Sequence, residues 1–310
     1  MVEKQTRWGD KRYHSLDYEL KQRYDRKIYK LSLDGGMTCP NRDGKLDTRG
    51  CIFCSAGGSG DFAADGRRSI LDQIESAKKL VSRKQTKDGK YIAYFQAFTN
   101  TYGTVTYLRK IFYEAIMHED IVALSIATRP DCLSDDILDL LAELNQIKPV
   151  WIELGLQTIH EETARFIRRG YELSVFDEAV KKLDSIGVEI IVHVIIGLPN
   201  ETLDHLLETL NHITNLPIKG IKLQLLHILK GTDLADYLDK LSILSLDEYL
   251  DILVACIEHI PKEIVIHRIT GDGPKNLLLA PLWSGNKKLV LNSIQKKFKL
   301  CDTWQGKALE

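Results

Sequence analysis

The amino-acid sequence predicts an α/β fold with a parallel sheet, and three observations support this class. Short apolar runs alternate with longer segments in which apolar residues recur at i, i+3, i+4 and i+7, the spacing of one helix face. Regular alternation of strands and helices is typical of βαβ units, whose strands are parallel. The 310 residues are 44% hydrophobic and 27% charged, which excludes a disordered or collagen-like chain. Six or seven such units fit a doubly wound sheet or a complete or partial barrel.

Seven short apolar runs are the candidate strands. Each holds between four and eight residues, a length typical of buried strands. In chain order the runs are Ile28–Leu33, Tyr91–Gln96, Ile121–Ala127, Val150–Leu154, Glu189–Ile196, Gly220–Leu226 and Ile264–His267. We therefore expect these runs to form one continuous sheet.

The segments between the runs have the apolar spacing of amphipathic helices. The clearest example has its apolar residues at Ile70, Ile74, Ala77 and Val81. Residues 203–213 repeat the same pattern. Ser134 and Ser245 each precede a further helical segment, and we expect them to be helix N-caps.

The chain divides most simply into one domain with an extension at each end. No Pro/Gly/Ser-rich linker and no internal repeat interrupts residues 28–270, so 1–27 and 271–310 are the extensions. Both ends are basic, and the body between them is acidic. An uneven balance of this kind indicates either an anionic partner, such as nucleic acid, or two solvated terminal helices. On charge alone, solvated helices are the preferred interpretation.

Targeting and membrane signals are missing from the sequence. No apolar run is long enough to span a bilayer, and the first residues lack the apolar core of a secretory signal. We therefore expect a cytoplasmic protein without a membrane partner, in a compartment that keeps thiols reduced.

The segment 34–67 is the exception to the regular pattern, since it is rich in glycine and holds three of the six cysteines. Cys39, Cys51 and Cys54 are spaced C-x11-C-x2-C. Three interpretations remain open. An iron–sulfur cluster on three thiolates, with one iron left open, ranks first. A structural zinc site ranks second, because it needs a fourth ligand. A redox pair of Cys51 and Cys54 ranks third. The other cysteines carry no motif.

Polar residues mark one end of the predicted sheet. Gln96, Arg129 and Gln157 lie at or just after the ends of three strands, and Glu153 and His193 lie inside apolar strands. A buried polar group without a partner costs several kcal/mol, so each inner residue has either a partner in the core or a ligand. Barrel enzymes and open sheets bind ligands at the carboxyl ends of their strands. The sequence therefore predicts one active site at this edge, facing the cysteines.

These features together resemble the radical S-adenosylmethionine enzymes. The resemblance rests on the cysteine segment, on Glu-Leu-Gly-Leu-Gln-Thr at 153–158 and on His-x-x-x-Gly-Leu-Pro at 193–199. The chain is most similar to the branch that contains the radical domain of the elongator catalytic subunit, and within it to a small group of uncharacterised bacterial proteins. That branch has longer gaps between its first two cysteines than the C-x3-C of the wider family. The last 40 residues are too few for the elongator's acetyltransferase domain.

The resemblance implies a fold, two cofactors and an electron donor. The fold would be a partial (β/α)6 barrel, similar to a TIM barrel, with 34–67 capping its mouth. Cys39, Cys51 and Cys54 would bind three irons of a [4Fe–4S] cluster, and S-adenosylmethionine would bind the fourth. A flavodoxin- or ferredoxin-type protein would supply the electron that releases a 5′-deoxyadenosyl radical. The residues expected to line the S-adenosylmethionine pocket are Gln96, Arg129, Glu153, Gln157 and His193.

Glu153 carries a more specific expectation. We expect Glu153 to accept a hydrogen bond from the ammonium or ribose group of the cofactor, since bonds to a carboxylate are strong. The alternative for Glu153 is a buried ion pair, with Arg129 as its candidate partner.

The resemblance also implies tRNA as a partner, because members of this branch modify wobble uridines. We expect tRNA to lie across the barrel mouth, held by the basic ends of the chain, so that charge reversal at Lys296, Lys297 and Lys299 would weaken binding. Aromatic residues near both ends would stack on unpaired bases; they are Trp8, Tyr13, Tyr18, Tyr24, Phe298 and Trp304.

Other functions remain open at this point. The terminal aromatics could instead anchor the ends of the chain to the barrel. The substrate could be a small molecule, such as a tetrapyrrole precursor. A third possibility is a zinc-stabilised RNA-binding module without catalysis.

Overall fold

A computed structural model of the chain describes residues 5–58, 60–81, 89–271 and 273–310. Its main sheet has seven parallel strands in the order β1-β2-β3-β4-β5-β6-β8. They are β1 (Tyr29–Leu33), β2 (Tyr91–Phe95), β3 (Ile121–Thr128), β4 (Val150–Gln157), β5 (Glu189–Ile196), β6 (Gly220–Leu225) and β8 (Val265–Arg268). All seven predicted strands are confirmed.

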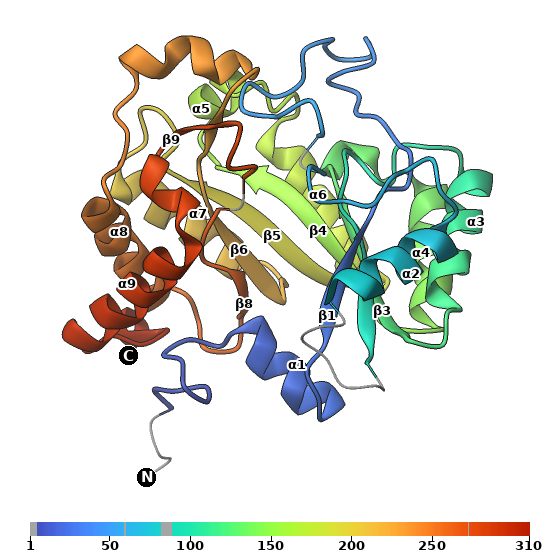
Figure 1. Cartoon of the computed structure of the whole chain (residues 1–310), viewed down its shortest axis with the longest axis horizontal. Helices are drawn as coiled ribbons and strands as arrows, with labels where there is room; N and C mark the ends of the chain where they lie inside the picture. Colours follow the sequence, from blue (N-terminus) through green and yellow to red (C-terminus); the bar gives the residue numbers. More distant parts are fainter. Residues whose placement is uncertain (1–4, 59, 82–88, 272) are drawn as a thin grey trace.

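The strand order decides between the two architectures that the sequence leaves open. Each strand of this sheet pairs with the member of the sheet that comes next in the chain, and the order does not reverse in the middle as it does in a doubly wound sheet. Successive right-handed crossovers then place the helices on one side, and the sheet curls round as an open barrel (Figure 1). The fold is therefore the expected partial barrel.

Nine helices flank the sheet within the described residues. They are α1 (Leu16–Tyr24), α2 (Ile70–Val81), α3 (Val105–Ile116), α4 (Asp135–Asn145), α5 (Glu161–Phe166), α6 (Leu173–Ser185), α7 (Leu203–Thr214), α8 (Leu246–Glu258) and α9 (Lys287–Leu300). Ser245 caps α8 as predicted, because its hydroxyl accepts from the Glu248 amide. Ser134 occupies the N-cap position of α4, but its hydroxyl binds the Asp136 side chain instead of a backbone amide. None of these helices is long and apolar enough to span a membrane.

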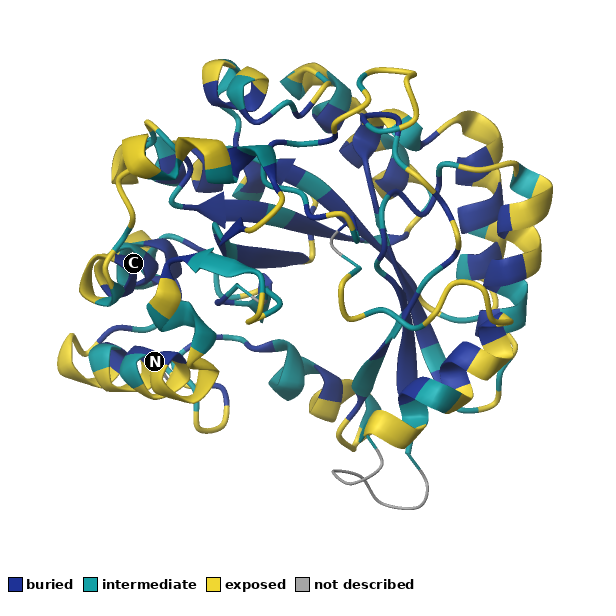
Figure 2. Cartoon of the chain, turned by 45° about the horizontal axis from the view of Figure 1, so that its top comes forward, coloured by how far each residue is buried: buried dark blue, intermediate teal, exposed yellow. Residues whose placement is uncertain are grey.

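The core lies between the sheet and the inner faces of the helices. Figure 2 shows the strands buried along most of their length, whereas the outer helix faces are exposed. Strands that are covered on both faces have almost continuous apolar sequences, and for this reason these segments can be identified from the sequence. Phe95 of β2 and Phe112 of α3 are fully buried and pack edge to face, with ring centroids 4.9 Å apart.

A two-stranded antiparallel sheet lies outside the main sheet. It pairs β7 (Ile228–Leu229) with β9 (Leu278–Ala280), and the sequence analysis does not predict it. Strands of two and three residues are too short to show an alternating pattern. This pairing ties the residues after 271 to the segment that follows β6.

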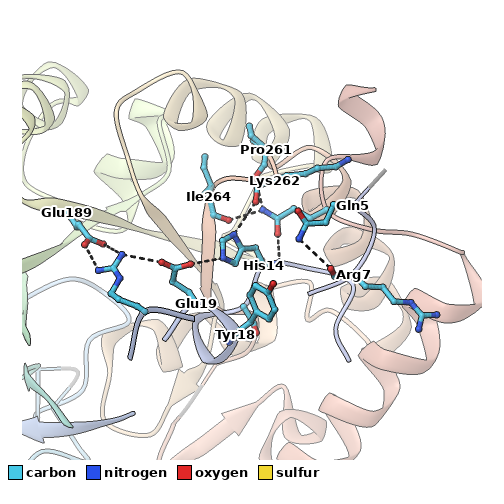
Figure 3. Close-up of polar contacts among 12 residues, drawn as sticks. Gln5, Arg7, His14, Tyr18, Glu19, Glu189, Pro261, Lys262 and Ile264 are labelled. Atoms are coloured by element: carbon cyan, nitrogen blue, oxygen red, sulfur yellow. Dashed lines mark hydrogen bonds and ion pairs between the residues drawn. The ribbon is translucent and has the colours of Figure 1, made fainter. Parts of the chain in front are cut away.

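The two ends of the chain meet at the amino ends of the strands. His14 binds Glu19 and the Lys262 carbonyl, and Arg23 pairs with Glu189, the first residue of β5 (Figure 3). Near the other end, Gln305 donates to the Pro261 and Ile264 carbonyls just before β8. The cysteine segment follows the carboxyl end of β1, on the opposite side of the barrel (Figure 1).

This placement contradicts the expected grip of the basic ends on tRNA at the barrel mouth. Trp8, Tyr13 and Phe298 are buried, and the Tyr13 and Phe298 rings pack edge to face. These three aromatics therefore anchor the ends of the chain to the barrel. The total charge of a segment does not reveal which end of the strands it reaches.

Candidate functional site

A cavity of about 250 Å³ opens at the carboxyl ends of the strands. A single water needs only about 10–15 Å³, so the cavity can take a small molecule. All eight residues selected from the sequence line it: Cys39, Cys51, Cys54, Gln96, Arg129, Glu153, Gln157 and His193. Residues that lie in or just after four strands (β2, β3, β4 and β5) and in one loop thus meet in one place, as the sequence predicts.

The cysteine segment is fixed by hydrogen bonds to its own backbone and to the segment after α5. The Cys54 amide donates to the Cys51 carbonyl at 2.9 Å, which forms the turn between these two residues. Asn41 is buried and donates to the Arg168 carbonyl at 2.8 Å and to the Cys51 sulfur at 3.5 Å. Arg42 donates to the Cys54 and Ser55 carbonyls. The described part of this segment is therefore an ordered cap over the cavity.

Close packing of this cap requires a glycine at position 58. Gly58 has φ of +58°, in the left-handed region, and a Cβ there would lie 2.2 Å from the Phe98 ring. Its carbonyl accepts from the Phe98 amide. No other residue satisfies both the conformation and the contact.

The three cysteines have the chemistry of cluster ligands. None of them is in a disulfide. Burial, together with Cys54 and Cys39, raises the pKa of Cys51 to about 12, so its thiolate needs a positive group such as a metal centre beside it. Three thiols that line one cavity are the ligand set of an iron–sulfur cluster with one open iron.

Below the cysteines, a network of buried polar side chains centres on Glu153. Its Oε1 accepts from the Lys30 ammonium at 2.5 Å and from the Ser125 hydroxyl at 2.7 Å. Its Oε2 lies 2.9 Å from His193 Nε2 and also accepts from Lys222. Glu153 is 1% exposed and Lys222 is 4% exposed. Both carboxylate oxygens therefore already hold protein donors.

The contacts within this network determine whether Glu153 and His193 are charged. Burial alone would raise the pKa of Glu153, but Lys222 and Lys30 hold it well below its usual range, so the carboxylate is ionised. Burial and Lys222 lower the pKa of His193 to about 4, so its ring is neutral. A neutral ring must donate from Nε2 to Glu153, which leaves Nδ1 to accept from the Gln224 amide at 3.3 Å.

These contacts correct two expectations about Glu153. The ion pair with Arg129 is wrong, because the partners of Glu153 are Lys30 and Lys222. The geometry also argues against Glu153 as an acceptor for the cofactor, since protein donors already occupy both oxygens. The carboxylate instead organises the charged inner end of the cavity.

Arg129 lies at the rim beside the cysteines. Its guanidinium binds both Asp131 oxygens, at 2.9 and 2.8 Å, and stacks over the Tyr171 ring. Burial would lower the pKa of Arg129, but Asp131 raises it above its ordinary value, so the positive charge is permanent. Cys39 and Cys51 also lie close enough to raise the pKa of the Arg129 guanidinium.

The two glutamines lie at the ends of β2 and β4 and line the cavity. Gln157 ends β4 with φ of 68°, a left-handed conformation that is uncommon outside glycine and concentrates at functional sites. The backbone N–H of Gln96 donates to the Leu33 carbonyl at 3.1 Å and so continues the pairing of β2 with β1. Both side chains line the cavity and can bind a ligand through either end of their amides.

Sequence reasoning missed three cations, of which Lys222 and Arg268 line the cavity and Lys30 binds Glu153. Lys30, Lys222 and Arg268 lie in β1, β6 and β8, inside or at the end of apolar runs. A charged residue within a buried run is the same signal that identified Glu153. Applied to lysine, that signal would have found Lys222.

Comparisons with protein families support the resemblance noted from the sequence. Residues 48–213 match the model of the radical SAM superfamily, and residues 218–299 match the radical SAM C-terminal domain. The uncharacterized protein YtqA of Bacillus subtilis is 47% identical over 300 residues, which cover 96% of this chain and 93% of that protein. Protein YhcC of Escherichia coli is 39% identical, with 87% and 86% covered.

The chain is also similar, at lower identity, to elongator proteins. Elongator complex protein 3 of Schizosaccharomyces pombe is 24% identical over 56% of this chain but only 32% of its own length. The structure of archaeal Elp3 from Methanocaldococcus infernus matches with a TM-score of 0.62 and 18% identity, covering 74% of this chain and 59% of that one. The radical SAM enzyme HemN of Escherichia coli matches at 0.51 and 16%, covering 77% and 54%. At these identities the structures support the fold alone.

Proposed function

Since the chain belongs to the radical S-adenosylmethionine superfamily and is an enzyme of that class, we propose that Cys39, Cys51 and Cys54 hold a [4Fe–4S] cluster and that S-adenosylmethionine binds beside it in the cavity. When bound and reduced, these cofactors supply a 5′-deoxyadenosyl radical. The observation that carries the proposal is that three half-buried thiols and five predicted pocket residues surround one cavity.

The residues around the cavity have separate tasks in this proposal. Asn41 donates to the Cys51 sulfur and holds that side of the loop. Arg129 places a permanent positive charge beside the thiolates and so favours their ionised form. Gln96 and Gln157 provide amide donors and acceptors for the polar groups of S-adenosylmethionine. The ordered cap limits the access of water and oxygen to the reacting groups.

For the substrate we propose a wobble uridine of tRNA. Similarity to elongator complex protein 3 supports this choice. The cavity rim supports it as well, because Phe53, Phe62 and Phe98 line the opening and Phe62 is 57% exposed. A base that leaves its stack can pack against such a ring. The proposal includes a cytoplasmic location and a flavodoxin- or ferredoxin-type electron donor.

The tRNA proposal places the contact at the mouth and not at the ends of the chain. Phe62→Ala should weaken tRNA binding by about 1–3 kcal/mol, since that is the usual contribution of stacking one base. Filter binding at fixed salt measures the change.

The matched control is charge reversal at Lys296, Lys297 and Lys299 in α9, whose carboxyl end packs beside Tyr13 at the opposite end of the barrel. This variant should bind tRNA as the wild type does. The reverse outcome, with the lysines required and Phe62 dispensable, would contradict a contact at the mouth.

The nucleosides of tRNA from cells that lack the gene test the substrate directly. We expect the wobble uridine to keep an unmodified or incomplete side chain there, and to regain the full one when the gene is restored. Unchanged wobble uridine would exclude the tRNA substrate and favour a small molecule, such as a tetrapyrrole precursor, for the same radical chemistry.

A further inference from the structure

The sulfur of Cys51 has a buried side-chain donor beside it. Asn41 is 1% exposed, and its Nδ2 lies 3.5 Å from Cys51 Sγ. The same nitrogen donates to the Arg168 carbonyl at 2.8 Å and lies 3.4 Å from the Arg169 carbonyl oxygen. Carbonyl oxygens only accept hydrogen bonds, so the NH₂ group of the amide, and not its oxygen, must face them. The surrounding backbone therefore holds Asn41 with a donor toward the sulfur.

The other end of the Asn41 amide shows that this orientation has a cost. Its Oδ1 is buried and has no hydrogen-bond partner among the described residues. Burial of a polar atom without a partner is unfavourable, and such an exception in a folded protein calls for a reason. Gly170 leaves the room that this oxygen needs, since a Cβ there would lie 2.8 Å from Oδ1. The fold thus tolerates an unpaired oxygen while the NH₂ group faces Cys51.

Binding of iron by Cys51 increases the need for this donor. As a thiol, Cys51 Sγ donates to the Arg168 carbonyl oxygen at 3.6 Å. A cysteine that binds a metal loses its proton, so the thiolate and this oxygen would then be two acceptors side by side. Asn41 donates to both of them and so offsets their repulsion. A hydrogen bond to the charged sulfur is also stronger than one to the neutral thiol.

We propose that Asn41 is a positioning residue that sets the reduction potential of the cluster through its hydrogen bond to Cys51. Reduction adds negative charge to a cluster and to its thiolate ligands. A donor to one of these sulfurs stabilises the reduced form more than the oxidised form, and so makes the reduction potential less negative. Asn41 would therefore help the cluster accept its electron. The proposal rests on the proposed function in one respect, that Cys51 is a ligand of the cluster.

A redox titration of the cluster-loaded protein, followed by electron paramagnetic resonance, tests this role. Asn41→Leu removes both side-chain donors with little change of size, so the reduction potential should become more negative. At a fixed ambient potential we expect the ratio of reduced to oxidised cluster to fall by about tenfold, which corresponds to about 59 mV for one electron. Iron analysis of the same samples shows whether the cluster is complete.

The matched control is Asn145→Leu. Asn145 ends α4, before the amino end of β4, and donates to the Gly187 carbonyl at 3.0 Å. Its loss also removes a bond from an asparagine to a backbone carbonyl, but far from the cysteines in the fold, so the potential should stay at the wild-type value. An Asn41→Leu protein with its full iron content and the wild-type potential would overturn the proposal, because a merely structural role does not change the potential.

If Asn41→Leu does not hold the cluster, pulsed electron paramagnetic resonance of the wild type decides the question. Protein labelled with the heavy nitrogen isotope in the side-chain amides of asparagine should show coupling of this nitrogen to the unpaired electron of the reduced cluster. Absence of the coupling would overturn the proposal. Neither measurement needs tRNA or turnover. A wild-type protein that binds no iron would overturn the proposed function and this inference with it, whereas an unchanged potential overturns the inference alone.

Discussion

Replacement of Cys39, Cys51 and Cys54 by alanine is expected to abolish iron binding. The wild-type protein, reconstituted without oxygen, should be brown and bind about four irons per chain, whereas the triple variant should be colourless. The physical reason is that the three thiols line one cavity, and that burial raises the pKa of Cys51, so its thiolate needs a metal centre beside it. Iron analysis and the visible absorbance spectrum measure the effect.

Two single variants are the controls for this loss. Cys132 is a half-buried thiol next to Arg129 and Asp131, and Cys256 is buried in α8. Cys132→Ala and Cys256→Ala should both keep the full iron content. If the triple variant still binds four irons, the cysteine segment is not the cluster site.

The second large effect is expected on stability. Glu153→Gln removes the carboxylate that pairs with Lys30 and Lys222, and leaves the buried Lys222 and the partly buried Lys30 without this counter-charge. Breaking a buried ion pair in this way typically lowers the free energy of unfolding by about 3–5 kcal/mol. Urea denaturation monitored by circular dichroism measures the loss.

The matched control is Glu208→Gln. Glu208 is a largely exposed carboxylate whose partner is His160 at 3.7 Å, so its loss should change stability by less than about 1 kcal/mol. Removing Lys30 and Lys222 together with Glu153, as Lys30→Met, Lys222→Met and Glu153→Gln, should restore much of the lost stability. Equal stability of Glu153→Gln and the wild type would show that the lysines are not held by this carboxylate.

The sequence predicts the sheet well because its strands are buried on both faces. Runs such as 121–127 and 189–196 are apolar almost throughout, and each appears as a strand with bounds that differ by at most one residue. The order of the strands follows from the resemblance and not from periodicity, which fits a doubly wound sheet equally well. The pairing of β7 with β9 depends on contacts between distant segments and leaves no local pattern.

Part of the candidate site can also be recognised in the sequence, and part of it cannot. The cysteines are recognisable by their spacing in a glycine-rich segment, and Glu153 and His193 are recognisable because polar residues are unusual in apolar runs. The partners of Glu153 are not recognisable, since Lys30 and Lys222 lie 123 and 69 residues away in the chain. The position of the basic ends is also a tertiary property, set by contacts such as Arg23 with Glu189.

The most direct test of the central claim is the cleavage of S-adenosylmethionine. The cluster-loaded wild-type protein, reduced by dithionite without oxygen, should form 5′-deoxyadenosine and methionine, and the Cys39, Cys51 and Cys54 triple variant should form neither. Chromatography of the quenched reaction, with and without tRNA, measures both products. A wild-type protein with its full iron content that forms no 5′-deoxyadenosine under either condition, or a triple variant that forms as much as the wild type, would contradict the account.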